Sequence, residues 1–149
     1  MFKTSVATRV ISFAVLITLL LGSFPTAVAA AKGNNRGLEV KWAKLVVLYK
    51  RQSQIHNSAP RWVAQWMSDH GKAPARKKAE LQKDLAISNA AWASVPSIVM
   101  THNGFDVQGN VVDKAAARQS VKDLSRALQR YNASIKNLKG FLRQYGMEI

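Results

Sequence analysis

A long apolar repeat near the C-terminus constrains the fold more than any other feature of this chain. From residue 121 to residue 145, large apolar side chains recur at alternating steps of four and three with no slip. This spacing places them on one side of an α-helix, as in the seam of a coiled coil. The helix therefore needs apolar partners elsewhere. The seam consists of Val121, Leu124, Leu128, Tyr131, Ile135, Leu138, Leu142 and Tyr145.

Helical spacing continues upstream of this seam. The seam itself predicts a helix over residues 114–145, with Asp113 as its N-cap. The same four-three spacing predicts helices over residues 37–56 and 74–94, and a shorter one over residues 59–70. No stretch alternates apolar and polar residues for long enough to build a sheet.

Residues that interrupt helices set the boundaries between these segments. Asn57 and Ser58 predict a break, with Ser58 capping the short helix and Pro60 in its first turn. Pro96 either ends the third helix or bends it, if one more turn follows. Two turn-forming glycine dipeptides within residues 102–112 predict an irregular arm or a small hairpin.

Together these segments predict an all-α protein: an antiparallel helical bundle of three long helices and one short helix. The bundle is expected to be one domain over residues 37–149, following a flexible lead-in at residues 30–36 and a signal peptide at residues 1–29.

The N-terminal segment has the layout of a secretory signal peptide. Lys3 and Arg9 precede an uncharged apolar run over residues 10–21. Ala27 and Ala29 supply the small side chains of a signal peptidase site, which predicts cleavage after Ala29. The expected location is therefore secreted or periplasmic.

The alternative is an uncleaved membrane anchor. Residues 10–31 carry no charge, but a spanning helix needs about 20 apolar residues. The continuous apolar run has only 12. Gly22 and Pro25 weaken the remainder as a helix, so cleavage is the favoured interpretation.

Charge is the strongest functional signal. The chain has 22 Lys and Arg, 8 Asp and Glu, and no Cys, for a net charge of +14. Packing alone must hold the fold, because no disulfide can form. So large a positive excess attracts polyanions, although it is also compatible with a merely solvated surface.

Two cation clusters are the candidate polyanion-binding sites. One lies at the start of the predicted helix 74–94, where free backbone N–H groups point toward the same anion. The other recurs at steps of four along the last helix, where Asp123 is the only acid between residues 114 and 143. The candidate residues are Lys72, Arg76, Lys77, Lys78, Arg118, Lys122, Arg126 and Arg130. The expected partners are anionic lipid headgroups, cell-wall polymers or nucleic acid, bound without sequence reading.

The long seam supports an alternative function. If it is longer than its partners, it can pair between chains in a homo-oligomer or in a holdase-like scaffold. The residues of that interface would be Val121, Leu124, Leu128, Tyr131, Ile135, Leu138 and Leu142.

Catalysis is not expected. The chain lacks a cysteine nucleophile, a Gly-x-Ser-x-Gly turn and a glycine-rich phosphate loop. No two of its three histidines have helical ligand spacing, so no metal, cofactor or specific small-molecule substrate is predicted. A small metal-dependent hydrolase using residues 102–113 is the weakest alternative. The four tryptophans fall on the predicted inner faces and are expected in the core.

Overall fold

The computed structural model describes residues 35–149, so the predicted signal peptide and residues 30–34 of the lead-in lie outside the described residues. The described chain is mostly helical and contains no strand, as the sequence predicts. Its helices are α2 (Arg36–Asp69), α3 (Ala75–Trp92), α4 (Val95–Thr101) and α5 (Lys114–Gln144).

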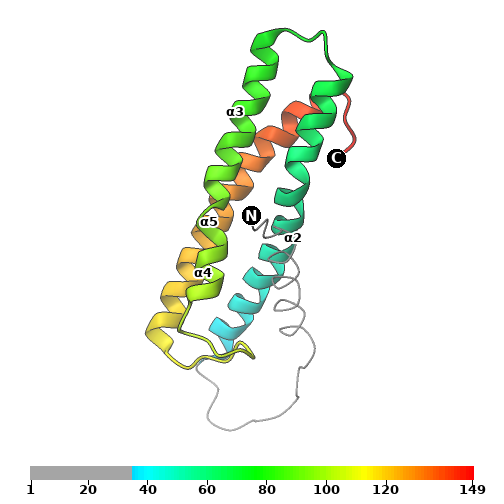
Figure 1. Cartoon of the computed structure of the whole chain (residues 1–149). Coiled ribbons are helices and arrows are strands. Elements are labelled where there is room, and N and C mark those ends of the chain that lie inside the picture. Colours follow the sequence, from blue (N-terminus) through cyan, green and yellow to red (C-terminus); the bar gives the residue numbers. More distant parts are fainter. Residues whose placement is uncertain (1–34) are drawn as a thin grey trace, which may run out of the picture.

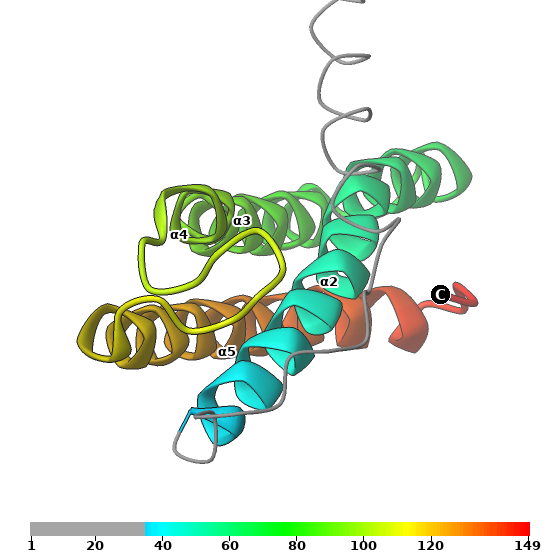
Figure 2. The same cartoon turned by 90° about the horizontal axis from the view of Figure 1, so that it is seen from below.

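The helices form an elongated bundle. Figure 1 shows α2 running upward, α3 and α4 running downward in succession, and α5 running upward again. Successive long helices are therefore antiparallel, while α2 and α5 run in the same direction and cross at an angle (Figure 2). We call the end where α2 and α5 begin the lower end. α5 packs against each of the other three helices, which makes it the centre of the fold.

The predicted seam lies on the inner side of α5. Leu124, Tyr131, Leu138 and Leu142 are completely buried, and Leu128 and Ile135 are nearly so. Asp113 caps the helix as predicted, since its Oδ1 accepts a hydrogen bond of 2.9 Å from the Ala116 amide. The seam packs within its own chain. Pairing between chains through these residues stays a prediction, and it would require the other helices to move away.

The predicted break at Asn57 and Ser58 is wrong, because α2 continues through it. The apolar stripe passes the break in phase: buried Gln52, Ala59 and Val63 stay on one face. The Ser58 hydroxyl donates to the Gln54 carbonyl at 2.9 Å instead of capping a new helix. Burial on both sides of the break therefore outweighs the local preference for a turn.

Pro60 remains inside α2 on its exposed side. It cannot donate a hydrogen bond to the His56 carbonyl, and its ring crowds the preceding turn. We expect Pro60→Ala to raise the free energy of unfolding by about 1–2 kcal/mol, after allowing for the greater freedom of the unfolded chain. Urea unfolding measures this change. An unchanged or lower stability would show that the proline is needed for packing.

Helical structure does not end at Pro96. A two-residue interruption follows α3, and α4 then begins at the completely buried Val95. Pro96 occupies the first turn of α4, where its missing N–H costs nothing. The one short helix of the bundle is therefore α4, and not the predicted helix over residues 59–70.

The connection between α4 and α5 lies on the bundle, as the predicted arm does. Phe105 is buried and stacks on Trp42 of α2 with ring centroids 4.7 Å apart. One isolated bridge joins Phe105 to Val111. The Asp106 side chain accepts from the amides of Gln108 and Asn110 and closes the turn between them. This loop, residues 102–113, forms the lower end of the molecule together with the first turns of α2 and α5 (Figure 1).

Candidate polyanion-binding groove

Half of the carboxylates of this protein bind amides instead of neutralising cations. Four of the eight accept hydrogen bonds from N–H groups of the backbone or of a side-chain amide. They are Glu39, Asp106, Asp113 and Asp123. Within residues 35–149, Lys77 and Glu80 form the one side-chain ion pair, at 3.6 Å. Most Lys and Arg side chains there consequently have no acidic partner.

A groove between α2 and α5 gathers several of these cations. Its volume is about 460 Å³, and it opens near the lower end. Lys41 and Lys44 of α2 face it from one side, and Lys122 and Arg126 of α5 from the other. Leu45, Val121 and Ser125 supply the rest of the lining.

No carboxylate lines this groove, and its four cations are exposed to solvent. Each cation belongs to a helix whose core-facing side is fixed by buried residues, so the bundle holds the four positive charges near one another. Like charges held together repel, and the repulsion is relieved when an anion binds. The groove can thus accept phosphate, sulfate or carboxylate groups, but it contains no pair of groups for acid–base chemistry.

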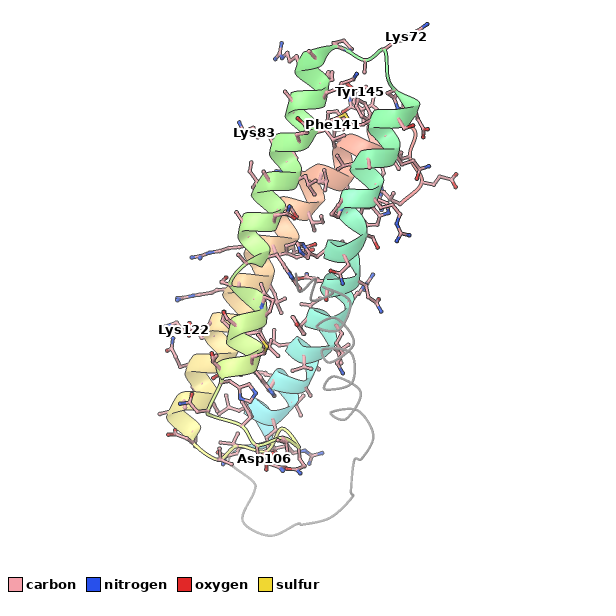
Figure 3. The ribbon with its side chains drawn as sticks, viewed as in Figure 1. Lys72, Lys83, Asp106, Lys122, Phe141 and Tyr145 are labelled. Atoms are coloured by element: carbon pink, nitrogen blue, oxygen red, sulfur yellow. The ribbon has the colours of Figure 1, made fainter. Side chains whose placement is uncertain are left out.

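The other cations predicted on α5 extend this surface. Arg118 and Arg130 lie on the same helix as Lys122 and Arg126 and are exposed, but they do not line the groove. The eight predicted cations are not brought together, since Lys72 lies near the upper end and Lys122 toward the lower (Figure 3).

The cluster at the upper end has partners within the chain. Lys77 lies over the rings of Phe141 and Tyr145, at 5.9 Å and 5.5 Å from their centroids. A hydrogen bond with Tyr145, more than the nearby Glu80, raises the pKa of Lys77. Lys78 donates to the Gly71 carbonyl at 2.6 Å. These two lysines support the structure, while Lys72 and Arg76 remain exposed.

Sequence reasoning missed Lys41 and Lys44 as site residues. Both stand off the apolar stripe of α2, but their position beside Lys122 and Arg126 depends on which helix packs next to α2. The periodicity of one helix does not contain that information. Considering the cations of every helix that could pack beside the cations of α5 would have included them.

Positive charge also crowds the upper part of the α2–α5 face. Lys139 lies over the Trp62 ring at 5.4 Å, so Trp62 is the predicted core tryptophan that remains partly exposed. Burial, and then the charges of Arg143 and Arg51, lower the pKa of Lys139. The other three tryptophans, Trp42, Trp66 and Trp92, are buried as predicted.

A polar layer crosses the middle of the core. Gln52 and His56 of α2, Ser88 of α3 and Tyr131 of α5 belong to it. Burial raises the pKa of Tyr131 to about 12, with Ser88 acting weakly in the other direction. The Gln52 Oε1 and His56 Nδ1 atoms are buried without a hydrogen-bond partner among the described residues. Buried atoms of this kind cost stability when they stay unpaired.

Two partly buried histidines predict a loss of stability in acid. Burial lowers the pKa of both His56 and His102 from the ordinary value of 6.5. Below about pH 6.5 the unfolded chain therefore takes up protons that the folded chain resists. We expect the free energy of unfolding to be insensitive to these groups above that pH and to fall as the pH drops toward 5.

Thermal unfolding of the protein and of His56→Gln/His102→Gln at pH 7 and pH 5 measures this effect. The double variant should lose less stability between the two values than the parent protein does. Equal losses in both proteins would assign the acid sensitivity to other groups.

A second hollow, of about 290 Å³, lies between α4 and the start of α5. It brings His102 near Asp123, but both oxygens of Asp123 accept from the Gln119 amide. Among residues 35–149, no three His, Asp or Glu side chains are placed to share a metal ion. None of the described helices has the length and apolar content to cross a bilayer.

Comparison with protein-family models, with curated proteins and with solved structures finds no match to this chain. The chemistry of its own side chains is therefore the basis for assigning a function.

Proposed function

We propose that this protein is exported and binds polyanions without reading their sequence, through the groove cations of α2 and α5. The observation that supports it most is the use of the carboxylates. Four of the eight bind amides, while Lys41, Lys44, Lys122 and Arg126 surround a groove with no acid in its lining. Arg118 and Arg130 extend the positive surface along α5.

Binding of this kind depends on the release of counterions. Each Lys or Arg that neutralises a phosphate frees a cation from the polymer, so affinity falls steeply as salt rises. If about six phosphates are contacted, affinity drops roughly 10³-fold between about 50 and 200 mM salt. A cell-wall polymer, a nucleic acid or an anionic lipid surface would each supply the necessary charge. The expected setting, secreted or periplasmic, follows from the predicted signal peptide.

Retention on heparin and on duplex DNA over a salt gradient tests the proposal. The protein should elute late from both matrices, and Arg118→Glu/Lys122→Glu/Arg126→Glu should elute much earlier. All three residues are exposed, so circular dichroism should show the variant folded. A flat dependence on salt, or equal elution of variant and parent protein, would overturn the proposed function.

A further inference from the structure

Exposed apolar side chains concentrate on the first turns of α2 and in the loop 102–113. Five of the seven large hydrophobic residues exposed among residues 35–149 lie on the first four turns of α2 or in the loop 102–113. These five are Val40, Val47, Leu48, Val107 and Val112. The most exposed are Val107, Val47 and Val112, at 74%, 66% and 64%. Single exposed apolar residues are ordinary, but a cluster of them marks a contact surface.

The two segments that carry these residues are packed together. The Val111 amide donates to the Glu39 carboxylate at 3.2 Å. Phe105 of the loop stacks on Trp42 of α2. A Cβ built on Gly109 would lie 3.9 Å from Cδ1 of the same indole. The loop and the first turns of α2 therefore meet at the lower end of the molecule (Figure 1).

Cations alternate with valines on the outward side of α2. Val40, Lys44, Val47 and Arg51 follow one another at steps of four, three and four, which places them on one side of α2. All four are exposed. Apolar residues mixed with Lys and Arg on a single helix side are typical of segments that lie in the interface of an anionic membrane.

We infer that the polyanion is the surface of a membrane rich in anionic lipids. In this arrangement, Val40, Val47, Val107 and Val112 enter the interface while Lys41 and Lys44 contact lipid phosphates. The inference rests on the proposed function and deepens it. A dissolved polymer offers the cations partners but leaves the valines in water, whereas a lipid surface satisfies both. A second copy of the chain is a poor occupant, because it would oppose this surface with positive charge of its own.

Two pairs of variants separate apolar insertion from charge. Val47→Ser/Val107→Ser and Val40→Ser/Val112→Ser each remove one valine from α2 and one from the loop and leave the net charge unchanged. Ile87→Ser/Met100→Ser is the matched control, because these two residues are also exposed but lie on α3 and α4. Each protein is purified as its host exports it, its mass establishes its N-terminus, and circular dichroism verifies its fold.

Co-sedimentation with vesicles of equal parts phosphatidylglycerol and phosphatidylcholine is the measurement, with heparin elution run in parallel. We expect both valine pairs to bind vesicles at least tenfold more weakly than the parent protein and to elute from heparin unchanged. The control pair should match the parent protein in both assays. Part of the parent protein's vesicle binding should also resist high salt, and this part should be lost in the valine pairs.

The outcomes distinguish this inference from the proposed function. If either valine pair binds vesicles as well as the parent protein does, or if the parent protein binds heparin and DNA but not vesicles, the membrane inference is overturned and the proposed function stands. If the parent protein binds none of the three, both are overturned.

Discussion

Gly104→Ala is expected to lower the free energy of unfolding by about 3 kcal/mol, because overpacking against a rigid neighbour is costly. Gly104 is buried in the loop 102–113, where it lies against the first turn of α5. A Cβ at this position would overlap the backbone N and Cα of Ala117 and the carbonyl carbon of Ala116. Helix backbone cannot rotate away as a side chain can, so the loop must lift from the bundle.

The consequence reaches beyond the added methyl group. The Gly104 carbonyl accepts from the Val112 amide at 3.0 Å, and Phe105 follows it into the core. Moving the loop disturbs both contacts. Thermal unfolding should show a midpoint lower by about 10 °C for a domain of this size.

Gly140→Ala is the matched control for Gly104→Ala. Gly140 lies inside α5 and has no neighbour within 4 Å of an added Cβ. Alanine at this position favours the helix, so we expect the stability to rise by about 0.5–1 kcal/mol. If Gly104→Ala proved as stable as Gly140→Ala, the close approach of the loop to α5 would be disproved.

Reversing two groove charges is expected to cost about 100-fold in affinity for duplex DNA at about 0.1 M salt, since each lost phosphate contact removes nearly one factor of ten. The variant is Lys41→Glu/Lys44→Glu, which alters the α2 side of the groove. Both residues are exposed and distant from the core, so the fold should be preserved. The slope of log affinity against log salt should become shallower by about two.

Lys72→Glu/Arg76→Glu is the control for this change. It alters the net charge by the same amount at the upper end of the molecule, where both residues are also exposed. If net charge alone determined binding, the two variants would weaken it equally. We expect the groove variant to bind at least tenfold more weakly than the control. Equal losses would remove the groove as the specific site and leave only a general positive surface.

The spacing of apolar residues predicts a helix correctly where packing against other helices does not change its limits. The limits of α5 agree within one residue of its C-terminus, because its seam runs without a slip and Asp113 caps its start. The predicted break in α2 at Asn57 and Ser58 is wrong. Turn-forming residues there compete with burial of Ala59 and Val63, and the strength of burial depends on helices that are remote in sequence.

The candidate site shows the same difference between what local spacing predicts and what helix packing decides. The outward cations of α5 follow from the position of its seam, but three of the seven residues that line the groove come from α2. Which helix lies beside α5, and at what height, follows from packing of the whole bundle. Lys77 and Lys78 show the converse, since both belong to a cluster predicted to bind anions but have partners within the fold.

The shared direction of α2 and α5 gives the molecule an electrical polarity. The peptide dipoles of a helix place about half a positive charge at its N-terminus and half a negative charge at its C-terminus. Two helix N-termini and one C-terminus lie at the lower end, and two C-termini and one N-terminus lie at the upper end, so α3 and α4 offset this polarity only in part. Lys78 at the upper end thus partly neutralises the negative charge near the C-terminus of α2. Lys41 and Lys44, in contrast, add to the positive charge near the N-terminus of α2. An approaching anionic surface would turn the protein so that its lower end arrives first.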